Sequence, residues 1–191
     1  MELTFFTDLH LYSSCETTVE LPEKADGKTF FLGDISDWKS AYYTFVDAAW
    51  NLVLNLRKRF GSDYIEGNHE GCKEYIRKTI PIDKEDGSKV KLTMTHGHFI
   101  CCAAEQAIKL STFTPGRGHI VRFFKWIGFR LRNLYVGKLG ADELIRAYAL
   151  AQEEGSQIVV FGHKHPRKMI DVEYNKVRMI CLPRGMTKIK F

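Results

Sequence analysis

Gly162-His163-Lys164-His165, followed directly by Pro166, is the sequence on which the interpretation of the whole chain depends. A tight turn that begins at a glycine lets two neighbouring imidazoles reach different targets. An apolar, strand-like run comes just before this turn, which places the turn at the end of a predicted strand. We therefore expect a polar loop there that carries two candidate metal ligands.

Four further polar groups follow apolar, strand-like runs earlier in the chain. They are Asp8 with His10, Asp34, Asn68 with His69, and His96. The runs that precede them are residues 3–6, 29–32, 64–65 and 92–95. Open α/β sheets bind their ligands at the carboxyl ends of the strands. The five loops are thus predicted to converge on one site at the edge of a sheet.

The chemistry of these side chains favours a pair of divalent metal ions. Aspartate oxygen and histidine nitrogen form a ligand mixture suited to manganese, with iron and zinc as alternatives. Two such ions can hold a bridging hydroxide and present it to a phosphorus atom. Asp34 is the natural bridge, because one carboxylate can bind a different cation through each oxygen. Two aspartates leave the pair of ions with net positive charge, which attracts a phosphate anion.

The length and composition narrow the class of protein. A chain of 191 residues with 45% hydrophobic residues is long enough for one domain, predicted over 1–191, and short for two. The five cysteines are odd in number and include no C-x-x-C, which argues against a disulfide framework and for a reduced, cytoplasmic setting. We find neither a signal-peptide pattern nor an apolar run long enough to span a bilayer.

The apolar pattern alternates between strand-like and helix-like segments, which is typical of α/β layering. Strands are predicted at 2–8, 29–33, 63–66, 80–83, 89–95, 157–161, 168–173 and 176–182. Helices are predicted at about 40–60 and 70–78, and again around 142–153.

A mostly helical insertion at about 99–156 interrupts this alternation. Between Gln106 and Ala141 there is no acidic residue, but there are seven basic ones. They are Lys109, Arg117, Arg122, Lys125, Arg130, Arg132 and Lys138. Because the whole chain carries only +5, the positive charge is concentrated in this segment, and such local charge suggests a partner.

A helical wheel of 117–138 separates an apolar face from the cations, which include Arg122 and Arg130, with Trp126 among them. One interpretation is a solvated cationic face whose aromatic residues are covered by the neighbouring helix. Another is a lid that meets an anionic, partly apolar ligand or a membrane surface. Single-stranded nucleic acid is a weaker third interpretation. Arg122 and Arg130 are the candidate substrate residues of this segment.

Five short motifs, in order, resemble those of the calcineurin-like metallophosphoesterase superfamily. They are Asp8-x-His10, Gly33-Asp34, Gly67-Asn68-His69-Glu70, His96, and Gly162-His163-x-His165. The resemblance covers nearly the whole chain. It implies a four-layer α/β/β/α sandwich, interrupted here by the basic helical insertion.

The resemblance also implies a role for each residue. One metal ion would be bound by Asp8, His10, Asp34 and His165, and the other by Asp34, Asn68, His96 and His163. His69 would stabilise the transition state or protonate the leaving oxygen. Asp37 would orient the ligands by contacting them without binding an ion itself. For His98 three possibilities stay open: it orients a ligand, it contacts the substrate, or it does neither.

The implied activity is hydrolysis of a phosphoester, and a departure from the family patterns narrows the substrate. Ser/Thr protein phosphatases carry G-D-x-x-D-R-G, whereas Trp38 and Lys39 follow Asp37 here. We therefore expect a phosphodiester, a nucleotide or another phosphorylated small molecule rather than a phosphoprotein.

Two alternatives remain. The opening Asp8-Leu9-His10-Leu11 and the basic insertion resemble the UDP-diacylglucosamine pyrophosphohydrolases, although those enzymes usually have arginine where this chain has His69. In that alternative the chain hydrolyses the pyrophosphate bond of a lipid-linked nucleotide sugar. The reaction takes place at the membrane surface, which 117–138 contacts. The non-enzymatic alternative is a scaffold of the same fold, but such scaffolds have eroded metal sites and every ligand position is filled here.

Overall fold

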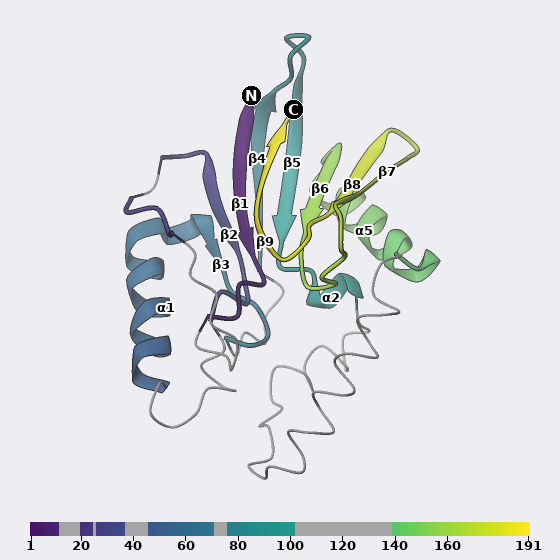
Figure 1. Cartoon of the computed structure of the whole chain (residues 1–191). Helices are drawn as coiled ribbons and strands as arrows, with labels where there is room; N and C mark the ends of the chain where they lie inside the picture. The colour runs from purple at the N-terminus through teal and green to yellow at the C-terminus, as the bar shows by residue number, and fades with distance from the viewer. Residues whose placement is uncertain (12–19, 25, 37–45, 71–75, 102–138) are drawn as a thin grey trace.

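The computed structural model (Figure 1) describes residues 1–11, 20–24, 26–36, 46–70, 76–101 and 139–191, which form two β-sheets and their covering helices. The first sheet has the order β3-β2-β1-β9. Its strands are β1 (Glu2–Thr7), β2 (Thr29–Leu32), β3 (Tyr64–Ile65) and β9 (Gly185–Lys190). β1, β2 and β3 are parallel, whereas β9 runs antiparallel to β1.

The second sheet has the order β4-β5-β6-β8-β7. Its strands are β4 (Arg77–Asp83), β5 (Lys89–Thr95), β6 (Ile158–Phe161), β7 (Ile170–Tyr174) and β8 (Val177–Cys181). β5, β6 and β8 are parallel, and each edge strand is joined to its neighbour as an antiparallel hairpin. Every residue of β6 is buried, as expected for an apolar strand covered on both faces.

Three apolar clusters hold these elements together. The first lies between the sheets and includes Phe5 and Phe30 from one sheet and Leu92 and Val160 from the other. The second packs α5 (Ala141–Glu154) and α2 (His98–Cys101) onto β6 and β8. The third packs α1 (Val46–Phe60) onto the outer face of the first sheet. α1 and α5 therefore cover opposite sides of the paired sheets (Figure 1).

The α/β class predicted from the sequence is confirmed, with two corrections among the elements. The helix predicted over 70–78 is wrong at its end, because Arg77 and Lys78 belong to β4 and pair with Thr95 and Met94 of β5. β9 was not predicted at all. In this strand only Ile189 is buried, so the apolar signal was too weak to recognise.

Several sequence predictions concern residues outside the described ranges. They are Asp37, the first part of the helix predicted over 40–60, residues 71–75 of the helix predicted over 70–78, and most of the insertion, with Arg122 and Arg130. In the part of the chain that is described, no helix is long and apolar enough to cross a membrane.

Candidate metal centre

The candidate ligands lie on five loops at the carboxyl ends of β1, β2, β3, β5 and β6. The first two loops are joined by backbone hydrogen bonds that continue the pairing of β1 with β2. The N–H of Asp8 donates to the carbonyl of Gly33 (3.0 Å), and the N–H of His10 donates to that of Asp34 (2.9 Å). Convergence of these loops at the edge of one sheet was predicted. The structure brings the ligands together, but from two sheets, since β1, β2 and β3 belong to the first and β5 and β6 to the second.

The backbone of the site is strained at its ligands. Seven non-glycine residues in the described ranges have positive φ, and five of them are candidate ligands. These are Asp8 (54°), His10 (52°), Asp34 (52°), His163 (68°) and His165 (50°). Such left-handed conformations cost on the order of 1–3 kcal/mol each and concentrate at functional sites. The backbone conformations that direct these side chains into the site therefore lower the local stability of the loops.

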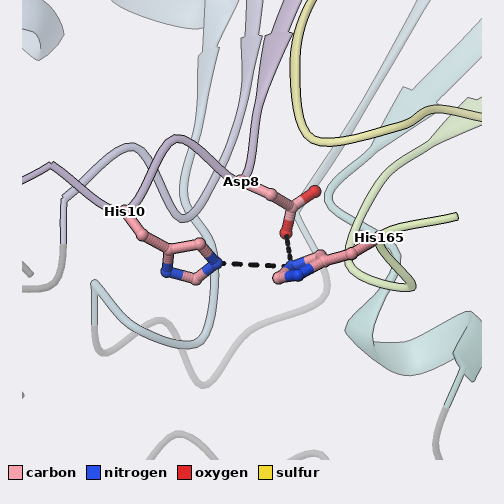
Figure 2. Close-up of side chains that lie close together, drawn as sticks. All are labelled: Asp8, His10 and His165. Atoms are coloured by element: carbon pink, nitrogen blue, oxygen red, sulfur yellow. Dashed lines mark hydrogen bonds and ion pairs between the residues drawn. The ribbon is translucent and has the colours of Figure 1, made fainter. Parts of the chain in front are cut away.

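The first ligand group consists of Asp8, His10 and His165, whose ligand atoms lie within 4.8 Å of one another. Figure 2 shows these three side chains pointing toward one another, with His165 Nε2 2.8 Å from Asp8 Oδ1 and 3.3 Å from His10 Nε2. The other oxygen of Asp8, Oδ2, accepts the N–H of His163 (2.8 Å) and the hydroxyl of Thr7 (2.6 Å). One oxygen is thus held by the fold while the other faces the imidazoles.

The second ligand group surrounds His96 Nε2. Asp34 Oδ2, Asn68 Oδ1 and His163 Nδ1 each lie 3.2 Å from this nitrogen. His96, Asp34 and Asn68 are buried, so these atoms converge in a site that the fold encloses.

Asp34 lies between the two groups. It belongs to the group with His96 and His163, and also to a group with His10 and His69. Its Oδ1 accepts the N–H of His69 (2.8 Å), which fixes the carboxylate while Oδ2 faces His96. Asp34 therefore contributes to more than one group of ligand atoms, and its role as a bridge between two ions stays a prediction.

The protonation of the ligands fits a divalent cation. Burial alone would raise the pKa values of Asp8 and Asp34, but the neighbouring histidines, His165 for Asp8 and His96 for Asp34, lower both well below the usual range. Burial and the charge of His96 lower the pKa of His163 to about 3, so this ring is neutral. Ionised carboxylates and neutral imidazoles are the ligand set that divalent transition metals bind.

His96 is oriented as metal-binding histidines are. Its Nδ1 donates to the carbonyl of Leu32 (2.6 Å), a bond that directs Nε2 toward the other ligand atoms. Burial lowers the pKa of His96, but the Asp34 carboxylate outweighs it and raises this pKa to about 9. A positive charge at Nε2 is therefore favoured, and a bound cation would supply it in place of a proton.

His69 and His98 differ in exposure. The His69 side chain is 38% exposed, with Nε2 4.0 Å from Asp34 Oδ2 and the ring edge-on to His10, so it lies where a substrate could reach it. His98 is only 2% exposed and packs against the rings of His96 and Phe99. Neither His98 ring nitrogen has a hydrogen-bond partner among the described residues. Burial, with the charge of His96, lowers the His98 pKa to about 3.

Glu70 and Lys164 acquire contacts that the sequence did not reveal. The sequence assigns no role to Glu70, although a carboxylate directly after Asn68 and His69 is a signal. It is buried, and burial and the charge of Asp34 raise its pKa to about 7, with hydrogen bonds opposing the shift. Lys164, between two candidate ligands, forms an ion pair with Glu143 of α5.

Comparison with known proteins identifies the family. The profile of calcineurin-like phosphoesterases matches residues 1–180. The chain therefore belongs to the calcineurin-like phosphoesterase family, and the resemblance found in the sequence is confirmed. This membership and the three Asp/His groups together support divalent metal binding.

Similar solved structures include Vps29 of Chaetomium thermophilum, at 9% identity and a TM-score of 0.45, covering 96% of this chain and 71% of that one. Vacuolar protein sorting 29 of Cryptosporidium parvum is 13% identical, with a TM-score of 0.41 and coverage of 96% and 74%. A predicted phosphoesterase of Streptococcus pneumoniae is 15% identical, with a TM-score of 0.37 and coverage of 100% and 84%. No curated protein matched.

Proposed function

We propose that the chain is a binuclear metal-dependent phosphoester hydrolase that acts on a phosphodiester of the nucleotide type or another non-protein substrate. The observation that carries this proposal is the position of Asp34, which shares one group of ligand atoms with His96 and His163 and another with His10 and His69. We further propose a single domain over 1–191 that works in the cytoplasm.

The two ions are proposed to be manganese, with iron or zinc as alternatives, since the ligands mix carboxylate, amide and imidazole. Asp8, His10 and His165 would hold one ion, and Asn68, His96 and His163 the other, with Asp34 shared. When bound, such a pair activates water as a nucleophile and offsets the charge of the phosphate.

The chain's own residues have distinct tasks in this proposal. The backbone donors on Asp8 Oδ2 and Asp34 Oδ1 keep the carboxylates fixed, so little reorganisation accompanies the reaction. His69, exposed beside Asp34, would donate a proton to the leaving oxygen. Among the described residues only two carboxylates, Asp8 and Asp34, contribute to the ligand groups, which keeps the site attractive to an anion.

The test is a metal-dependence assay on a panel of substrates. Protein stripped with chelator and then supplied with Mn²⁺, Fe²⁺ or Zn²⁺ would be assayed on bis(p-nitrophenyl) phosphate, p-nitrophenyl phosphate and a nucleotide pyrophosphate. We expect Mn²⁺ to restore turnover of the diester above that of the monoester. Absence of bound metal, together with absence of Mn²⁺-stimulated hydrolysis, would favour the scaffold instead, and turnover in the absence of metal would contradict the mechanism.

The alternative substrate is a lipid-linked nucleotide sugar, whose pyrophosphate bond would be cleaved at the membrane surface. The observation in its favour is the seven basic residues of the insertion, with Trp126 among them. Replacement of Arg122, Arg130 and Trp126 by alanine separates the two proposals. Loss of turnover on a lipid substrate, with the soluble diester spared, would assign 117–138 to peripheral lipid recognition. If the variant turns over both substrates as fast as the wild type does, a role of 117–138 in lipid recognition is excluded.

A further inference from the structure

Glu70 is a buried carboxylate that no step of the proposed reaction uses. It is 3% exposed and accepts four hydrogen bonds. Oε1 accepts the N–H groups of Ile35 (2.8 Å) and Ser36 (3.3 Å) and the hydroxyl of Tyr64 (2.5 Å), and Oε2 accepts the N–H of Gly67 (2.9 Å). A buried charge needs such compensation, and an ionised carboxylate, which only accepts, suits a position surrounded by donors.

The two oxygens of Glu70 connect two ligand loops. Ile35 directly follows Asp34, and Gly67 directly precedes Asn68. The parallel ladder between β2 and β3 consists of two residue pairs and ends before either loop begins. The carboxylate of Glu70 therefore carries the connection between these chain segments beyond the end of the ladder.

The two loops are packed without free space between them. A Cβ atom on Gly33 would lie 2.5 Å from Gly67 N, and one on Gly67 would lie 2.0 Å from Asp34 Oδ1. The same Asp34 oxygen accepts the N–H of His69 at 2.8 Å. Any change in the spacing of the loops must therefore move the Asp34 carboxylate relative to Asn68.

We propose that Glu70 is a positioning residue for the second ligand group. It sets the spacing between the Asp34 and Asn68 loops and thereby the affinity of that group for a divalent ion. This inference rests on the proposed function. The first ligand group, Asp8, His10 and His165, lies on other loops and depends on the bridged loops only through the shared Asp34, so loss of the Glu70 bridge affects the two ions unequally.

Glu70→Gln is the variant that breaks the bridge with the least change in shape. Its amide oxygen can still accept from Ile35 and Tyr64, but its NH₂ group then meets the N–H of Gly67, donor against donor. Glu66→Gln is the matched control. It makes the same chemical change four residues earlier, where the carboxylate pairs with Arg57 instead of joining two ligand loops.

The experiment is a titration of Mn²⁺ into metal-free protein, followed by calorimetry and by the electron paramagnetic resonance of coupled Mn²⁺ pairs. We expect two ions in the wild type and in Glu66→Gln, with affinities within about threefold of each other. In Glu70→Gln the ion of the second ligand group should bind about 10- to 100-fold more weakly, as for other partners of metal ligands, while the ion of the first group, which shares only Asp34 with these loops, should lose much less affinity. Neither readout depends on turnover.

The outcomes separate this inference from the function on which it rests. Wild-type affinities for both ions in a folded Glu70→Gln protein would overturn the positioning role and leave the function intact. Equal weakening of both ions would overturn it as well, since it indicates a general loss of structure. A wild type that binds no Mn²⁺ would overturn the proposed function. If circular dichroism shows that Glu70→Gln is unfolded, Glu70→Asp is tested in its place. The aspartate side chain is one methylene too short to bridge the two loops. Wild-type affinities of Glu70→Asp for both ions would again refute the positioning role.

Discussion

Gly67→Ala places a methyl group where the structure leaves room only for hydrogen. The new Cβ would lie 2.0 Å from Asp34 Oδ1, 2.5 Å from Asp34 N and 2.7 Å from Asp34 Cγ. Gly67 has no positive φ, so the backbone tolerates alanine and the whole cost is steric. Relief requires the Asp34 loop to move by about 1 Å, a misplacement that can lower turnover about 100-fold.

The same overpacking should lower the free energy of unfolding by about 1–3 kcal/mol. For a chain of this length each kcal/mol corresponds to a fall in Tm of roughly 2–4 °C. The assay is hydrolysis of bis(p-nitrophenyl) phosphate with saturating Mn²⁺, paired with thermal denaturation. Turnover should fall far more than the loss of folded protein at the assay temperature can explain.

Gly140→Ala is the control for this substitution. Within the part of the chain that the structure describes, its Cβ would meet only Glu143 Oε2, at an ordinary 3.6 Å, and its φ of −75° suits any residue. Turnover and Tm of this variant should stay near wild type. Wild-type turnover in Gly67→Ala would refute the view that the close approach of these two loops fixes the Asp34 carboxylate.

Three further predictions concern the ligands and the ions. Asp34→Asn should remove the shared carboxylate and lower the content of both ions, measured by elemental analysis after dialysis; loss of neither would contradict the shared role. His69→Asn should retain both ions yet lower kcat by about 10²- to 10⁴-fold on substrates with poor leaving groups, and much less on p-nitrophenyl esters. A uniform loss on all substrates would count against proton donation. Chelation should lower the Tm, and Mn²⁺ at about 100 times its Kd should restore about 2.7 kcal/mol of stability, because ions that bind the native state stabilise it. A Tm that does not respond to metal would argue against a metal site.

The arrangement of the candidate site was predictable because it depends on topology more than on detail. Polar residues that follow the parallel strands of one sheet meet at its carboxyl edge, whatever the exact bounds of the strands. The sequence did not show that the strands here belong to two sheets, β1, β2 and β3 to one and β5 and β6 to the other. Asp8, Asp34, His96 and His163 each follow such a strand, and the structure places Asp8 in one group of ligand atoms and Asp34, His96 and His163 in another. Their order along the chain was enough to identify the family.

The features that the sequence did not reveal depend on contacts between distant residues. β9 has a single buried residue, Ile189, and owes its strand conformation to six residue pairs with β1. Arg77 and Lys78 looked like the end of a helix and are strand because β5 lies beside them. Glu70 looked like an ordinary motif carboxylate, and only the fold shows that its partners come from two ligand loops.

The most direct measurement is anomalous diffraction from a crystal grown with Mn²⁺. We expect two anomalous peaks on either side of the Asp34 carboxylate, one beside Asp8, His10 and His165 and the other beside Asn68, His96 and His163. A crystal with abundant Mn²⁺ and no peak among these side chains, or with Asp34 turned away from both groups, would contradict it.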